Sequence, residues 1–234
     1  KESEKNLKIL SVKNLMYIGN IKFSGEIEKK DLVDKNLEIL KKKTFWCAVS
    51  THKGEENICL NTHINLKKTY NDLVTIIVPR HIKRCIEISN LCEKYNLSSQ
   101  ILDDKELINN EKEIIIINSF GTLSKFYNYS KSVFIGKSMI KKLEKVSGQN
   151  PIEAAKLRCK IYHGPYVYNF KEIYDLLKSY KISEEVNDEK ELYKKLTRDL
   201  KNSEDREGKT ANIINDMGQK ILDKTTREIN KLLI

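Results

Sequence analysis

The chain has 234 residues, of which 39% are hydrophobic and 32% charged, and its 43 lysines and arginines outnumber 33 acidic residues to give a net charge of +10. Apolar residues recur too regularly for wholesale disorder, and the longest uncharged stretch, Ile114–Ser124, is much shorter than the ~20 residues of a membrane-spanning helix. Only six of the basic residues are arginines, and arginine is the usual side chain for bidentate contacts with nucleic-acid bases. The positive charge therefore favours attraction to an anionic membrane surface or a phosphorylated ligand over binding of nucleic acid.

Short apolar runs alternate with longer helical patterns along the chain. Runs such as Val74–Val78 and Ile114–Ile117 are continuous, which is typical of strands buried on both faces of a parallel sheet. Strands are predicted at Leu15–Phe23, Thr44–Ser50, Leu73–Pro79, Glu113–Ser119, Ser132–Gly136, Cys159–Gly164 and, more weakly, Ser183–Asn187. Helices are predicted at Asp31–Lys43, Glu55–Tyr70, Ile82–Tyr95, Gly121–Tyr129, Pro151–Lys156, Val167–Tyr180, Glu189–Asn202 and Asp205–Leu233.

This alternation predicts an α/β fold with a doubly wound parallel sheet. We expect one domain over residues 15–204, with residues 1–14 as an incoming linker and residues 205–234 as a terminal helical arm. The sequence opens Lys1-Glu2-Ser3 without an initiator methionine or a signal peptide. We therefore expect the chain to be part of a longer protein.

The five cysteines are scattered singly, without a Cys-x-x-Cys pair. This pattern favours structural thiols in a reducing compartment over disulfides or a metal site. His52 and His81 follow two predicted strands at equivalent positions, but two histidines without a third ligand are a poor metal site. Such histidines more often have a structural than a catalytic role. No metal and no cofactor are predicted.

Polar residues gather where the predicted strands end, which is where ligands bind in open α/β sheets. One of these loops, Gly136-Lys137-Ser138, is not a P-loop, because Lys131 stands where that motif requires a glycine. A nucleoside-triphosphatase is therefore excluded. The other loops are Ser50–Glu56, Pro79–His81, Asn118–Thr122, Ser147–Glu153 and His163–Pro165 with Asn169 and Phe170.

Two of these segments have both a structural and a functional interpretation. In the structural interpretation, Asn150-Pro151-Ile152-Glu153 is a capped start of a helix. In the functional interpretation, the N-terminus of this helix faces a ligand crevice and attracts phosphate, and the Glu153 carboxylate accepts hydrogen bonds from ribose hydroxyls. Arg80 could be a surface arginine paired with a carboxylate, or a clamp for a phosphate.

In this order and at these spacings, the loops resemble the C-terminal half of a bacterial 3-deoxy-D-manno-octulosonic acid (Kdo) transferase. Enzymes of this family add Kdo from CMP-Kdo to the lipid A precursor. The resemblance extends from about Leu15 to Asn169. Its segments are Gly19–Phe23, Ser50–Glu56, Val78–His81, Asn118–Leu123, Phe134–Ser138, Gly148–Glu153 and Gly164–Phe170.

The resemblance implies a GT-B architecture of two Rossmann-like domains, of which this chain would be the donor-binding one. It implies CMP-Kdo contacts for Pro79, Arg80, Phe120, Gly121, Thr122, Asn150, Pro151, Ile152 and Glu153. Supporting roles in the donor loops are expected for Ser50, Thr51, His52, Ser138 and Asn169. No catalytic residue is expected in this chain, because the family's general base and its site for the acceptor lipid belong to an N-terminal domain. The partners implied are CMP-Kdo, the lipid A precursor and the cytoplasmic face of the inner membrane.

Three positions depart from the family's pattern. Asn118 and Thr122 stand where acidic residues are usual, and Gln149 stands where histidine is usual. These changes affect individual donor contacts more than the fold. Two alternatives remain open: another GT-B protein that uses UDP-sugars, and a basic module that binds membranes or nucleic acid. A basic binding module would need its lysines gathered on one face, whereas Lys and Glu are interleaved along Glu189–Lys195, which disfavours this alternative.

Overall fold

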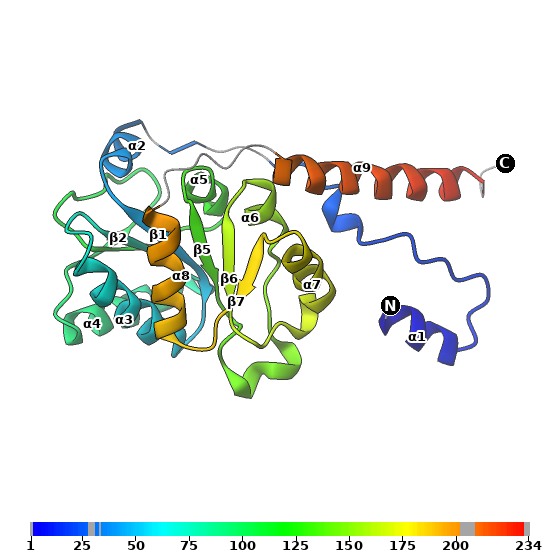
Figure 1. Cartoon of the computed structure of the whole chain (residues 1–234), viewed down its shortest axis with the longest axis horizontal. Helices are drawn as coiled ribbons and strands as arrows, with labels where there is room; N and C mark the ends of the chain where they lie inside the picture. The colour runs from blue at the N-terminus through cyan, green and yellow to red at the C-terminus, as the bar shows by residue number, and fades with distance from the viewer. Residues whose placement is uncertain (1, 28–30, 33, 202–208, 232–234) are drawn as a thin grey trace. The chain divides into compact units, whose positions relative to one another are not determined.

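A parallel sheet forms the body of the chain. In the computed structural model, which describes residues 2–27, 31–32, 34–201 and 209–231, seven strands lie in the order β3-β4-β2-β1-β5-β6-β7 (Figure 1). Every neighbouring pair is parallel, so the predicted doubly wound α/β fold is confirmed. The strands are β1 (Phe45–Thr51), β2 (Val74–Pro79), β3 (Ser99–Leu102), β4 (Ile114–Ile117), β5 (Ser132–Ile135), β6 (Lys160–His163) and β7 (Ser183–Glu185).

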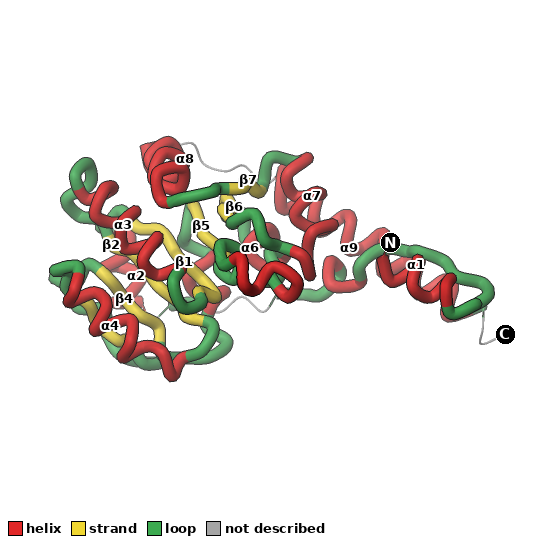
Figure 2. Tube along the Cα trace, turned by 90° about the horizontal axis from the view of Figure 1, so that it is seen from below, coloured by secondary structure: helices red, strands yellow, loops and turns green. Residues whose placement is uncertain are grey.

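Helices cover both faces of this sheet, which explains why β2 and β4 are buried at every position. In Figure 2, α3 and α8 lie on one side of the strands and α6 lies on the other. Trp46, Leu60, Phe134 and Leu196 belong to the apolar cluster between the sheet and the α3–α8 layer. The helices of this body are α2 (Asp34–Lys41), α3 (Glu55–Lys67), α4 (Cys85–Lys94), α5 (Leu123–Tyr127), α6 (Ile152–Lys156), α7 (Lys171–Ser179) and α8 (Glu189–Lys201).

Two strand predictions differ from the structure. Leu15–Phe23 is not a strand: residues 15–20 have no regular structure, and Ile21–Phe23 form a 3-10 helix that begins where Asn20 Oδ1 accepts the Lys22 N–H at 3.1 Å. Among the described residues, no strand pairs with this segment. Conversely, Ser99–Leu102 is a strand that the sequence did not predict. This strand lies at the edge of the sheet and pairs only with β4, so it can contain polar residues and lacks the continuous apolar pattern of a buried strand.

The described chain divides into two compact units, one of residues 27–211 and the other of residues 1–26 with residues 212–234. The second unit contains α1 (Glu2–Ile9) and most of α9 (Lys209–Asn230). Gly218 of α9 allows close packing, because a Cβ there would lie 2.1 Å from the Phe23 carbonyl oxygen. The boundaries predicted after residues 14 and 204 stay predictions, and the second falls at residues that the structure does not describe.

All five cysteines are free and buried. Burial raises the pKa of the Cys47 thiol to about 12, as expected for an unreactive core thiol. Within the part of the chain that the structure describes, no helix combines the length and the apolarity that crossing a bilayer requires.

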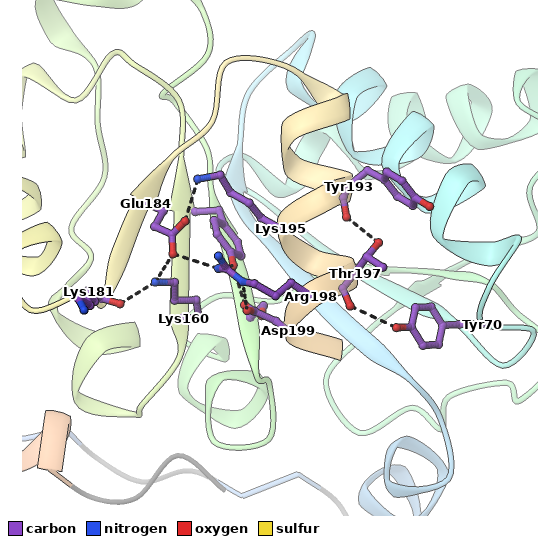
Figure 3. Close-up of polar contacts among 11 residues, drawn as sticks. Tyr70, Lys160, Lys181, Glu184, Tyr193, Lys195, Thr197, Arg198 and Asp199 are labelled. Atoms are coloured by element: carbon purple, nitrogen blue, oxygen red, sulfur yellow. Dashed lines mark hydrogen bonds and ion pairs between the residues drawn. The ribbon is translucent and has the colours of Figure 1, made fainter. Parts of the chain in front are cut away.

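A charged cluster joins α8 to the edge of the sheet (Figure 3). The carboxylate of Glu184 in β7 binds three cations: Lys160 Nζ at 2.6 Å, Lys195 Nζ at 2.8 Å and Arg198 Nη2 at 3.0 Å. Nearby, the Tyr162 hydroxyl donates a hydrogen bond to Asp199 Oδ2 at 2.7 Å. These contacts hold the last helix of the body against β6 and β7.

The Glu184 cluster predicts acid sensitivity. Partial burial raises the pKa of Glu184, but Lys160, Lys195 and Arg198 outweigh that effect and lower it from 4.5 to about 2. A carboxyl with a depressed pKa in the folded state stabilises the fold fully above its unfolded pKa, and this contribution disappears as the pH falls from about 4.5 through 2. Glu184→Gln should therefore flatten the decrease in unfolding free energy over that pH range, as measured by urea denaturation.

Glu185→Gln is the matched control, because the adjacent Glu185 is exposed. This variant should keep the pH dependence of the parent chain. An acid profile that is the same in Glu184→Gln and the parent would contradict the assigned role of the cluster.

Candidate functional site

The strand order reverses between β1 and β5. From β1 the chain builds outward through β2 to the edge at β3 and β4, and then returns to place β5 on the other side of β1. In open α/β sheets, ligands bind outside the carboxyl ends of the strands at such a reversal, because the loops on either side diverge and leave a crevice. The loops after β1, β5 and the neighbouring β2 therefore define the candidate site.

The carboxylate of Glu55 holds the two central loops together. Its Oε2 atom accepts the backbone N–H of His52 at 2.9 Å and of Lys137 at 2.7 Å. Its Oε1 atom accepts those of Ser138 at 2.8 Å and Met139 at 3.0 Å. The side chain is fully buried, so these four donors replace its hydration shell. One carboxylate thus fixes the loop after β1 to the loop after β5.

The close approach of these loops also depends on Gly136. A Cβ on Gly136 would lie 2.7 Å from the Glu55 Oε2 atom and 2.7 Å from the Ser50 carbonyl oxygen. Any side chain at this position would therefore separate the two loops. Ser50 itself adopts a left-handed φ of 54°, where the pairing of β1 with β2 is interrupted by a register shift between Val49 and Thr51.

The end of β1 is joined directly to the end of β2. The Arg80 N–H donates to the Thr51 carbonyl at 3.1 Å, and the rings of His52 and His81 meet edge-on with their centroids 5.8 Å apart. Burial lowers the pKa of His52 more than the Ser50 carbonyl and Glu55 raise it, and the charge of Lys137 lowers it further. The surroundings of His52 therefore favour its neutral form.

Arg80 is exposed, and its guanidinium has no ion pair with any described residue. Arg84 behaves differently, because it forms a bidentate pair with the buried Glu56, with distances of 2.7 Å and 3.1 Å. Of the two interpretations of Arg80 that the sequence left open, the pairing with a carboxylate is therefore not seen among the described residues. Its donors are available to a ligand.

The loop before α6 is connected to the same site. Gly148 N–H donates to the Lys137 carbonyl at 2.8 Å, and Asn169 holds this loop from outside through a 2.9 Å bond from its side-chain amide to the Val146 carbonyl. The Ser138 hydroxyl bonds only to backbone groups in these contacts. It donates to the Ile135 carbonyl at 2.7 Å and accepts the Gly164 N–H at 2.9 Å. The supporting roles that were predicted for Ser138 and Asn169 in donor binding stay predictions.

The predicted helix start differs by one residue from the observed one. The helix α6 begins at Ile152, and Pro151 occupies the N-cap position without a capping side chain. Asn150 lies just outside and accepts the Ile152 N–H on its Oδ1 at 3.1 Å. Glu153 is half-buried in the first turn, while Pro151 and Ile152 are buried.

The loop of Phe120, Gly121 and Thr122 follows β4, one strand further out than Arg80. Phe120 is 72% exposed, Gly121 has a left-handed φ of 69°, and Thr122 accepts a hydrogen bond from the Ser119 hydroxyl at 3.2 Å. None of the hydrogen bonds described for these three residues reaches Arg80 or Asn150. Only the strand order places this loop near the rest of the site.

Sequence reasoning gave no role to Glu55, the residue that assembles the site. A signal was present, because Glu55 follows Gly54 directly at the start of a helix that comes after a buried strand. Three of its four partners, however, lie 82 to 84 residues away along the chain, and only the His52 N–H is local. No group of three or more His, Cys, Asp or Glu among the described residues is arranged to hold a metal ion.

Comparison with known proteins supports the resemblance inferred from the loops. The chain is 27% identical over 220 residues to the 3-deoxy-D-manno-octulosonic acid transferase of Haemophilus influenzae, covering 92% of this chain and 49% of that protein. It is 30% identical over 233 residues to the transferase of the same name from Rickettsia bellii, covering 95% and 53%. No family model matches the chain.

A solved structure supports the fold. The C-terminal CMP-Kdo binding domain of WaaA from Acinetobacter baumannii matches with a TM-score of 0.64 and 22% identity, covering 81% of this chain and 94% of that domain. The chain spans about half the length of the curated relatives it matches. The predicted resemblance to the Kdo transferases is therefore confirmed by the sequence comparison, and the fold is that of a CMP-Kdo binding domain.

Replacing Glu55 tests whether it holds the loops together. In Glu55→Gln, an amide would face two of the backbone donors that the carboxylate now accepts, so we expect the free energy of unfolding to fall by about 2–3 kcal/mol. Glu87→Gln serves as the control, since Glu87 forms only surface pairs, with Arg84 at 3.3 Å and Lys53 at 3.5 Å, and should change stability by less than about 1 kcal/mol. Urea denaturation measures both. Equal stabilities of the two variants would refute the role of Glu55.

Proposed function

We propose that this chain is the donor-binding half of a Kdo transferase, which binds CMP-Kdo for transfer of Kdo to the lipid A precursor in lipopolysaccharide core biosynthesis. The observation that carries the proposal is the convergence of the loops after β2, β1 and β5 at the strand reversal, where the guanidinium of Arg80 forms no ion pair with a described residue. The similarity to the curated transferases runs through all of these loops, because it covers 92% and 95% of the chain.

Arg80 would bind the phosphate of CMP-Kdo. When the bond between the phosphate and the sugar breaks, negative charge builds up on the departing CMP, and a fixed guanidinium stabilises that charge. Removing one such donor commonly lowers the rate by ~10²–10³. The start of α6 would add less, because this helix has only five residues and Asn150 already accepts the Ile152 N–H.

The remaining predicted residues would hold the nucleoside. Glu153 lies in the first turn of α6, where a carboxylate can accept hydrogen bonds from ribose hydroxyls. Phe120 is exposed enough to pack against a base or sugar, and Pro79 ends β2 immediately before Arg80. Pro151, Ile152, Gly121 and Thr122 would shape the backbone around the ligand.

The reaction would be an inverting transfer in which a carboxylate base deprotonates a hydroxyl of the acceptor lipid, which then attacks the anomeric carbon of Kdo. The resemblance assigns that base and the lipid site to an N-terminal domain, and this chain spans about half of the curated relatives. The acceptor is embedded in the membrane, so we propose that the whole enzyme works at the cytoplasmic face of the inner membrane. The net charge of +10 would favour such an anionic surface.

Nucleotide titration tests the donor site. We expect calorimetry to detect binding of CMP by the 234-residue chain, with weaker binding of UMP and AMP. Arg80→Ala should lower the CMP affinity by about tenfold or more through loss of a charged hydrogen bond, and Glu153→Ala by a similar factor. The control is Lys94→Ala, because the exposed Lys94 is the last residue of α4 and belongs to none of the loops of the candidate site.

Equal binding of UMP would indicate a UDP-sugar enzyme instead. Salt-sensitive binding of DNA or RNA that CMP does not affect would indicate a nucleic-acid module.

A second prediction concerns catalysis. Supplied with CMP-Kdo and the lipid A precursor, the chain alone should release no CMP above the buffer rate, because it would lack the general base. Measurement of CMP release checks this. Turnover by the isolated chain would show that the base lies within these 234 residues.

A further inference from the structure

Lys137 occupies an unusual position in the site. It follows β5 directly after Gly136, at the strand reversal, and its backbone is left-handed with a φ of 57°. A side chain in this conformation costs roughly 1 kcal/mol relative to glycine, which adopts it freely. Residues held in such conformations concentrate at ligand-binding sites.

The conformation of Lys137 is fixed from both sides of its backbone. Its N–H donates to Glu55 Oε2 at 2.7 Å, and its carbonyl accepts the Gly148 N–H at 2.8 Å. The first bond ties it to the loop after β1, and the second ties it to the loop before α6. The direction in which its side chain leaves the backbone is therefore determined by the fold.

The ammonium group of Lys137 forms no ion pair among the described residues. Other partly buried cations of this body do: Lys160 pairs with Glu184 at 2.6 Å, and Lys125 with Asp104 at 2.9 Å. The buried carboxylate next to Lys137 is that of Glu55, which is already saturated by four backbone donors. The charge of Lys137 is also felt at His52, whose pKa it lowers in addition to the larger effect of burial.

Arg80 and Lys137 lie on the two sides of β1. Arg80 follows β2 and Lys137 follows β5, and both of these strands pair with β1. Two strand spacings amount to about 10 Å, which extended side chains readily bridge. A ligand seated at the end of β1 would therefore lie between two cations, neither of which has a protein carboxylate as partner among the described residues.

We infer that Lys137 is a second anion-binding residue of the donor site, opposite Arg80. The inference rests on the proposed function. CMP-Kdo carries two separate anions, the phosphate of CMP and the carboxylate of the sugar acid, so a site with two unpaired cations matches its charge. The attraction between such groups is strongest where the protein has already oriented them and excluded part of the solvent.

The test uses Lys137→Gly, which removes the cation and suits the left-handed backbone. We expect its melting temperature to equal or exceed that of the parent, while its affinity for CMP or CMP-Kdo falls about tenfold. A loss seen with CMP identifies the phosphate as the anion bound, and a loss seen only with CMP-Kdo identifies the carboxylate. Lys137→Arg, which keeps the charge, should restore most of the affinity.

Lys181→Gly is the matched control. Lys181 is an exposed lysine with a similar left-handed φ of 59°, located between α7 and β7. This variant should bind both ligands as the parent does. Unchanged affinities in Lys137→Gly would overturn the inference, and so would an equal loss of affinity for cytidine, which has no anion. If the parent binds neither CMP nor CMP-Kdo, the proposed function fails, and this inference fails with it.

Discussion

The buried carboxylate of Glu55 is the interaction on which the candidate site depends. It accepts four backbone N–H groups from two loops that the chain order separates by more than 80 residues. A buried charge is tolerated only when its hydrogen bonds are satisfied, so the carboxylate and the two loops require one another. The close approach that Gly136 permits completes this arrangement, since a side chain there would displace the carboxylate.

Charge is distributed differently at the edge of the sheet and at its strand ends. At the edge, Glu184 neutralises Lys160, Lys195 and Arg198, and the result is a structural contact that holds α8 (Figure 3). At the ends of β2 and β5, Arg80 and Lys137 have no carboxylate partner among the described residues. Cations that a fold leaves unpaired beside a strand reversal are suited to an anionic ligand, which is the basis for the proposed binding of a nucleotide sugar.

The short length of α6 lowers the expected contribution of its N-terminus to phosphate binding relative to that of the side-chain cations. The sequence pattern around Asn150 left open a helix terminus as a phosphate site, but a helix of five residues has a small dipole, and its Ile152 N–H is already bonded to Asn150. Side-chain cations are therefore the stronger candidates for stabilising the leaving group. The chain spans about half the length of the curated transferases, and binding of the donor by this half is the function that we propose.

The sequence by itself determined the parallel α/β fold, because continuous apolar runs such as those of β2 and β4 can be buried only under helices on both faces. It also located the polar loops at strand ends. Only the tertiary structure decided the strand order, and with it the reversal between β1 and β5 that places the loops of Arg80, His52 and Lys137 at the ends of three neighbouring strands. It likewise revealed β3, excluded a strand at residues 15–23, and gave Glu55 its role. The physical reason is the same in each case. Strand pairing and backbone hydrogen bonds join segments that are far apart along the chain, and the local pattern of apolar and polar residues does not specify which segments pair.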